Sequence, residues 1–139
     1  MEKIKVIRKK PNNEIEVVEM NHTIKDFQKY VKGLVEFVSL PKGVNIDIIC
    51  NDNFLNEEME PNFVLPERVE IICGPVIIAG YDPETGHTVS LTDKQMKVAT
   101  DYLANNSVYN MSIRGAYRYV KVLRDYQKDM EKMNHEREI

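Results

Sequence analysis

The segment VEIICGPVIIA, residues 69–79, consists of two short apolar runs separated by Gly74-Pro75. Short runs rich in Ile and Val are typical of buried strands, and a Gly-Pro pair marks a turn. The pattern predicts a pair of neighbouring strands, 69–73 and 76–79, joined by a tight connection. Such a pair is stable only when further strands or helices cover it.

Further strand patterns precede this pair. Polar and apolar residues alternate in 3–8 and again in 14–19, on either side of the turn signal Pro11-Asn12-Asn13. This arrangement predicts a hairpin with one exposed face. Two more strand-like runs, 33–40 and 44–50, lie on either side of Pro41-Lys42-Gly43.

One short helix is predicted among the strands. Thr23 is a suitable N-cap, Gly33 is a suitable stop, and apolar residues between them share one helical face: Phe27, Tyr30 and Val31. The segment 51–61 is polar and acidic and shows little periodicity, so we expect a surface loop there.

The pattern changes at Thr92. Thr92 and Gln95 have capping-box spacing, which predicts a helix from there to about residue 103 or 104. Asn105-Asn106-Ser107 breaks this helix, and a second helix is expected from about Ser112 to about Met133.

The order of these elements, strands first and helices last, favours an α+β fold over alternating βαβ units. We therefore predict a single domain over residues 1–139. It would have an antiparallel, strand-rich core with one short helix over 1–91, followed by a helical extension over 92–139 that helps to form a homo-oligomer.

Composition excludes several classes of protein. The 139 residues are 42% hydrophobic and 29% charged, which is typical of a folded domain. The formal net charge of −3 predicts no general attraction to DNA or to an anionic membrane. No apolar run approaches the roughly 18 residues of a membrane span, and the N-terminus does not resemble a signal peptide. We therefore expect a cytoplasmic protein.

No metal site, cofactor site or catalytic set is predicted. Cys50 and Cys73 lie in apolar runs and form no CxxC motif, which favours two buried, reduced thiols. The histidines are scattered and form no HxH or HExxH ligand set: His22, His87 and His135. The sequence thus shows no catalytic constellation, and we do not expect an enzyme.

The last helix has an unusually wide apolar face. At about 100° per residue, its apolar side chains cover more than half of the circumference. A helix that packs on one sheet needs only a stripe, so the extra width favours contact with a second copy of the chain. The alternative is that the preceding helix covers this flank. The residues concerned are Ile113, Ala116, Tyr117, Tyr119, Val120, Val122, Leu123, Tyr126, Met130 and Met133.

The same helix has a cationic face. Arg114 and Arg118 are four residues apart, Lys121 follows on that face, and Tyr117 lies at its edge. Two neighbouring guanidinium groups can hold one anion, and a tyrosine ring can stack on a base. The alternative is a solvated basic face, paired with Asp125 or with acids of the first half.

Three segments resemble a small domain that is found mainly in phages and Gram-positive bacteria and whose function is unknown. They are IKDFQKYVKGLVEFVSLPKGVNIDIICND (24–52), EPNFVLPERVEIICGPVIIAGYD (60–82) and SLTDKQM (90–96). The resemblance extends over about residues 3–98. It implies a fold but no chemistry.

Together with the segment NNSVYNMSIRGAYRYVKVLRDYQ (105–127), the chain resembles the first-described Thoeris anti-defence family. Members of that family are phage proteins that sequester nucleotide immune signals. The resemblance implies an α+β protomer that forms dimers and higher assemblies in the host cytoplasm. It also implies pockets between protomers that bind glycocyclic ADP-ribose isomers and release them unaltered, and some members bind cyclic oligonucleotides as well.

In this resemblance, Arg114 and Arg118 match the helix arginines expected to bind phosphates. An aromatic residue near the end of the sheet should stack on adenine, and position alone suggests Tyr81 or Phe63. With Tyr117 and Lys121, these residues form the expected ligand site. Two other functions stay open: a protein-binding module that inhibits a host protein through the helix face, and, less favoured, a nucleotide-degrading enzyme.

Overall fold

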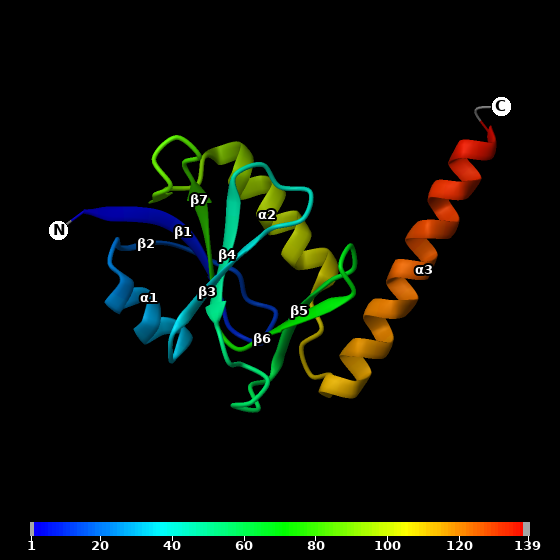
Figure 1. The fold of residues 1–139 in the computed structure, drawn as a ribbon, viewed down its shortest axis with the longest axis horizontal. Helices are drawn as coiled ribbons and strands as arrows, with labels where there is room; N and C mark the ends of the chain where they lie inside the picture. Colours follow the sequence, from blue (N-terminus) through cyan, green and yellow to red (C-terminus); the bar gives the residue numbers. More distant parts are fainter. Residues whose placement is uncertain (1, 138–139) are drawn as a thin grey trace.

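The computed structural model describes the backbone of residues 2–137 and the side chains of residues 2–133 (Figure 1). Strands come first and two long helices last, which confirms the predicted α+β class with an antiparallel sheet. The elements in chain order are β1 (Lys3–Lys9), β2 (Glu16–Asn21), α1 (Ile24–Val31), β3 (Val35–Ser39), β4 (Ile46–Asn51), β5 (Pro61–Leu65), β6 (Glu70–Cys73), β7 (Val76–Tyr81), β8 (Thr88–Val89), α2 (Asp93–Asn106) and α3 (Ile113–Arg137).

The strands form two antiparallel sheets. The larger has the order β2-β1-β7-β4-β3, and β8 pairs with the end of β7. The smaller consists of β5 and β6. Residues 76–80 of β7 are buried, which explains why this strand is apolar without alternation.

The predicted pairing of 69–73 with 76–79 is wrong. β6 pairs with β5 in the small sheet, whereas β7 lies between β1 and β4 in the large one. Gly74, with φ of 80°, and Pro75 separate the two strands. Both runs are apolar on both faces, so their pattern carries no information about the partner of each strand. The strand that pairs with β6 is β5. Its first residue, Pro61, was expected to be the last residue of a surface loop.

Other local predictions are confirmed. β1 and β2 form the expected hairpin, with Lys3 opposite Asn21 and Arg8 opposite Glu16. Thr23 caps α1 by accepting a hydrogen bond from the backbone N–H of Asp26 at 3.2 Å. The helix ends at Val31, just before the predicted stop.

The capping box at the start of α2 is also present. The Thr92 hydroxyl accepts from the Gln95 N–H at 3.1 Å, and the Gln95 side chain accepts from the Thr92 N–H at 2.9 Å. α2 continues through Asn105 and Asn106, slightly beyond the predicted end, and α3 begins at Ile113.

The large sheet is covered on both faces. Because successive side chains of a strand point to opposite sides, Ile49 and Ile77 pack with Phe27 and Val31 of α1. Their neighbours Ile48 and Ile78 pack on the opposite face. The residues of α2 and the small sheet in that second cluster are Ala99, Tyr102, Leu103, Phe63, Leu65 and Ile72.

Asn62 of β5 joins the two sheets through a buried polar junction. Its amide Nδ2 donates to the carbonyl of Lys9 at 2.9 Å and to that of Gly74 at 2.8 Å. Lys9 is 1% exposed, and its ammonium donates to the side-chain and backbone oxygens of Asn62. The Asn62 carbonyl also accepts from the Val108 N–H at 3.2 Å. One residue thus fixes the end of β1, the β6–β7 turn and the segment before α3.

Replacing Asn62 with Ala should strongly destabilise the protein. The change leaves the Lys9 ammonium and two buried carbonyls without their side-chain partner. Each buried group left unpaired costs about 1–3 kcal/mol, so we expect a loss of at least 3 kcal/mol in the free energy of unfolding, measured by urea denaturation. Asn56→Ala is the control, because Asn56 bonds only Asn53 on the exposed surface. Equal effects of the two changes would contradict this role of Asn62.

Lys9 should also give the stability a pH dependence. Burial lowers the pKa of its ammonium from 10.5 to about 8, so above pH 8 the folded state releases a proton that the unfolded state keeps. This contribution therefore makes stability rise as pH rises above 8. Burial raises the pKa of Cys50 to about 12 and of Cys73 to about 11, which opposes the rise above pH 9.

Between pH 8 and 9, the contribution of Lys9 to the free energy of unfolding can therefore be measured apart from that of the cysteines. The free energy of unfolding of the wild type, relative to that of Lys9→Met, should increase between these two pH values. Parallel pH profiles of the two proteins would contradict the lowered pKa.

Candidate functional site

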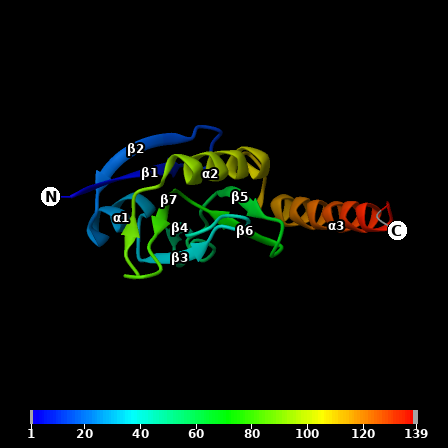
Figure 2. The same ribbon diagram turned by 90° about the horizontal axis from the view of Figure 1, so that it is seen from above.

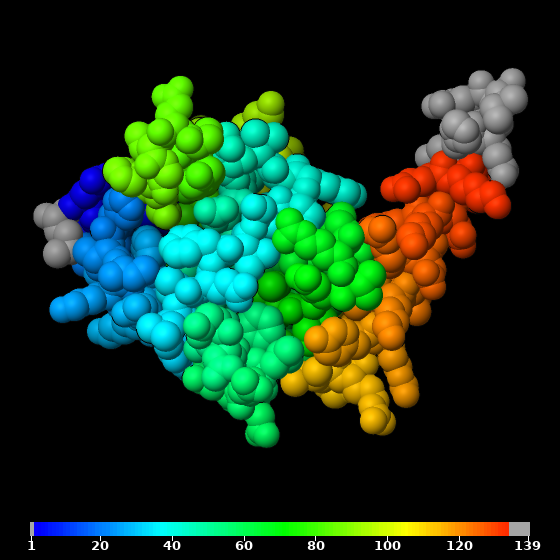
Figure 3. All heavy atoms as spheres, in the orientation of Figure 1, coloured from blue at the N-terminus to red at the C-terminus, as the bar shows by residue number. Residues whose placement is uncertain are grey.

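The first half of α3 is anchored on the small sheet. Ala116 and Val120 are buried against Val64 and Ile71. Arg124 donates from Nη1 to the carbonyl of Glu67 at 2.7 Å. Beyond this point the helix extends away from the body of the molecule (Figures 1 and 2). The sphere view shows the same protrusion (Figure 3).

The predicted cationic face is present at the base of this helix. Arg114, Arg118 and Lys121 are all exposed and, at about 100° per residue, lie within roughly 60° of one another around the axis. In the part of the chain that the structure describes, none of the three forms a salt bridge, and Asp125 does not pair with them. These side chains are therefore accessible from solvent and are not engaged in ion pairs among the described residues.

An apolar stripe adjoins the cationic face. Its side chains are among the most exposed apolar groups of the structure: Val122 (64%), Tyr126 (62%), Met130 (39%) and Met133 (51%). The alternative that α2 covers this flank is therefore wrong, since these residues are uncovered in the protomer. Val122 is one helical turn from Arg118, so the apolar and cationic surfaces are contiguous.

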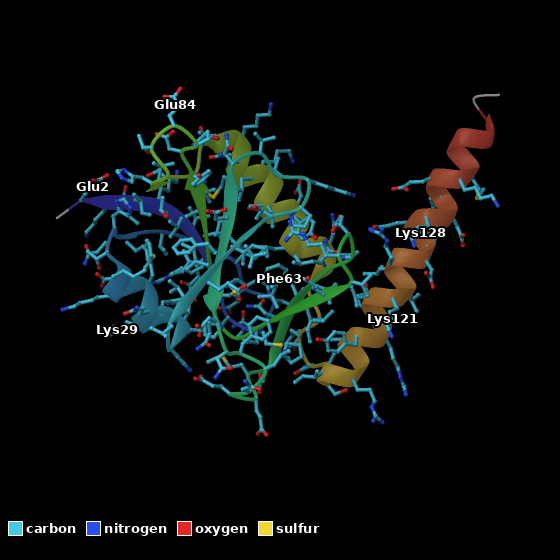
Figure 4. The ribbon with its side chains drawn as sticks, in the orientation of Figure 1. Glu2, Lys29, Phe63, Glu84, Lys121 and Lys128 are labelled. Atoms are coloured by element: carbon cyan, nitrogen blue, oxygen red, sulfur yellow. The ribbon has the colours of Figure 1, made fainter. Side chains whose placement is uncertain are left out.

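Of the predicted aromatic residues, only Tyr117 lies on α3 beside the arginines, and Tyr81 and Phe63 lie elsewhere in the protomer. Tyr117 is half-buried and packs against the small-sheet cluster. Tyr81 ends β7, next to the turn that carries Glu84, at the opposite side of the molecule from Lys121 (Figure 4). Phe63 lies in the middle of the body and is 0% exposed, so its ring presents no face to a ligand. Burial in the core removes Phe63 from the candidate site.

A second candidate site was not found from the sequence. It is a cleft of about 860 Å³ beside α1, bounded by the β1–β2 hairpin, α1, the segment 57–60 and the turn at Gly74-Pro75. Its charged lining residues are balanced in sign. They are Lys3, Arg8, Lys10, Lys29 and Lys32 against Glu19, Asp26, Glu57, Glu58 and Glu60.

Two of the residues that line this cleft, Arg8 and Tyr30, each carry a buried polar atom without a hydrogen-bond partner among the described residues. The Arg8 guanidinium lies over the Tyr30 ring, with Cζ 4.8 Å from the ring centroid. Its Nη2 pairs with Glu16 at 3.2 Å, whereas the buried Nε and the buried Tyr30 hydroxyl have no partner among the described residues. Burial is the main cause that raises the pKa of Tyr30. Unpaired buried groups of this kind cost about 1–3 kcal/mol each and call for an explanation.

Sequence reasoning missed the cleft for a physical reason. Its walls come from four segments that are distant in the chain, and each carries ordinary surface charges. The available signal was an arginine in β1 on the face where the alternation places the apolar residues Ile4 and Val6, and a tyrosine on the apolar face of α1. Only the packing of α1 beside β1 brings them together.

The remaining reactive groups are structural in character. Cys50 and Cys73 are buried free thiols, as predicted, and burial raises the pKa of both. The Tyr102 hydroxyl donates to the Glu67 carboxylate at 2.6 Å. Among the side chains of residues 2–133, no three His, Cys, Asp or Glu are grouped so that they could hold a metal ion. The helices described include none long and apolar enough to cross a membrane.

Comparison with protein families gives one match, to the domain of unknown function DUF3846, over residues 4–104. The chain belongs to the DUF3846 family. Neither the comparison with curated proteins nor that with solved structures gave a match.

The extent of the DUF3846 match separates the two candidate sites. Matching ends at Ala104 inside α2, so the residues that line the cleft beside α1 lie in the DUF3846 domain, except Lys3, which directly precedes it. Arg114, Arg118 and the apolar stripe lie on α3, beyond the matched residues. The cleft is thus a feature of the domain, whereas the cationic surface belongs to the helix that follows it.

Proposed function

We propose that this DUF3846 protein is a phage anti-defence protein that binds a nucleotide immune signal and sequesters it without degrading it. The ligand would be a cyclic ADP-ribose isomer of the glycocyclic type, and cyclic oligonucleotides are further candidates. The observation that carries the proposal is the exposed Arg114–Arg118 pair, which adjoins an uncovered apolar stripe on a helix that extends from the domain.

Energetics favour a ligand site that is completed by a second copy. Nanomolar affinity corresponds to about 12 kcal/mol, whereas a charge-assisted hydrogen bond contributes about 1.5–3 kcal/mol. Two arginines are therefore insufficient by themselves. Stacking on an aromatic ring and burial between subunits would supply the remainder, and the stripe on α3 offers both Tyr126 and apolar area for this purpose.

In such an assembly Tyr81 would contact the ligand only from a partner copy, because it lies at the far side of its own protomer from α3. Tyr117 would act at the edge of the arginine pair, and Lys121 would add a third positive charge for a diphosphate.

Replacing both Arg114 and Arg118 with Ala should abolish binding of glycocyclic ADP-ribose isomers and leave the oligomer intact. Native mass spectrometry reports ligand stoichiometry and assembly in one measurement. The ligand should be released unaltered on heating. Lys128→Ala on the exposed outer part of α3 is the control and should bind as the wild type does. Undiminished binding by the double variant would remove these arginines from the site.

Tyr126→Glu should disrupt the assembly. The side chain is 62% exposed in the protomer, so the change leaves the core untouched while placing a charge in the stripe. We expect the oligomer to dissociate in sedimentation velocity, with an unchanged melting temperature of the domain. Assembly equal to that of the wild type would contradict a role of the stripe between copies.

The second candidate function is a protein-binding module that inhibits a host protein, and the same uncovered stripe favours it. It predicts a stoichiometric complex with a host protein and no affinity for nucleotide signals. Pull-down from host lysate with the wild type and with Tyr126→Glu separates the two candidates. Loss of one defined host protein with the variant, together with no nucleotide binding by the wild type, would favour the module.

A further inference from the structure

We propose that the cleft beside α1 is a second ligand site, which binds a phosphate ester of a sugar or nucleoside by capturing Arg8 from its pairing with Glu16. The proposal does not depend on α3, because every residue that lines this cleft lies between Lys3 and Pro75.

The size of the cleft fits a small organic ligand. Its volume of about 860 Å³ lies within the range of about 300–1,000 Å³ that is usual for small-molecule sites. Met20 and Met59 are among its lining residues, and methionine side chains adapt to flat or irregular apolar groups. A sugar or a base can therefore pack there while a charged group engages the polar wall.

Not all hydrogen-bond donors of the Arg8 guanidinium have a partner among the described residues. A carboxylate or phosphate that engages the side of a guanidinium accepts from Nε and Nη2 together. Glu16 accepts only from Nη2, at 3.2 Å, and Nε is buried without a partner among the described residues. The hydroxyl of Tyr30, whose ring lies under the guanidinium, is likewise unpartnered among the described residues. A phosphate oxygen pair would satisfy the donors that Glu16 leaves unused.

Loss of the Glu16 partner costs Arg8 little. Its pair with Glu16 is partly exposed, with side chains that are 30% and 45% accessible, and such pairs add little stability. Because Nε is buried, the ligand reaches it only when the guanidinium rotates out of its stack on Tyr30. Lys10 and Lys29 line the same cleft and add positive charge, so a doubly charged phosphate is favoured over a single carboxylate.

The acidic half of the lining defines the rest of the ligand. Glu57, Glu58 and Glu60 accept hydrogen bonds, which suits the hydroxyl groups of a sugar or the amino group of a base. They repel a bare polyanion. A ligand that joins a phosphate to several hydroxyl donors therefore fits the balanced lining better than inorganic phosphate does.

Isothermal titration of the full chain with ribose 5-phosphate and with ADP tests the proposal. At least one probe should bind, whereas adenosine and inorganic phosphate should bind at least tenfold more weakly. A preference for ribose 5-phosphate identifies a sugar phosphate, and a preference for ADP a nucleotide. No binding of either phosphate ester, or equal binding of inorganic phosphate, would overturn the proposal.

Substitutions at the two residues of the Arg8–Glu16 pair should change the affinity for the ligand in opposite directions. Arg8→Met should weaken binding at least tenfold, and Arg8→Lys, which keeps the charge but lacks the paired donors, should weaken it severalfold. Glu16→Gln should strengthen binding severalfold, because it removes the competitor while Glu16 is not part of the cleft lining. Weaker binding by Glu16→Gln would contradict capture of Arg8, even if Arg8→Met failed to fold.

The double change of Arg114 and Arg118 to Ala separates this site from the one proposed on α3. It should leave binding of ribose 5-phosphate and ADP unchanged. If it abolished their binding, the probes would occupy α3 and the inference about the cleft would fail while the proposed function stood.

Discussion

Both sheets of the molecule depend on the buried junction at Asn62. A small two-stranded sheet is marginal by itself, and here it is held against the large sheet by an amide that bonds the end of β1 and the β6–β7 turn. The same residue accepts from Val108 and so fixes where the chain leaves α2 for α3. The junction therefore links the two sheets to the segment that leads into α3, and the packing of α3 on the small sheet then directs the helix.

The junction also explains why the two candidate sites are separate. α3 rests on the small sheet and extends outward, which leaves its cationic and apolar surfaces uncovered. The cleft lies beside α1 and includes Gly74-Pro75, next to the carbonyl that Asn62 holds. One surface is presented by a single exposed helix, whereas the other is already a cleft. Their chemistry differs accordingly: a cluster of positive charge on α3, and a balanced lining in the cleft.

Local sequence signals predicted the parts of the fold that depend on neighbouring residues. Thr23 and Thr92 cap their helices as expected, and the turn after β1 gives the expected hairpin. The prediction that β6 pairs with β7 was wrong because two runs that are apolar on both faces can pair with any other strand. The prediction that the Phe63 ring is accessible was wrong for a related reason. Its strand was not recognised in the sequence, and all residues of that strand are buried.

By itself, the sequence determined the α+β class, the burial of both cysteines and the presence of a cationic pair on the last helix, because periodicity and spacing are local properties. Tertiary structure alone decided the partner of each strand and the exposure of the stripe on α3. It also decided that Arg8 lies over Tyr30 with an unused donor. Those features arise where segments distant in the chain pack together, and no single segment carries a signal for the partner it will meet.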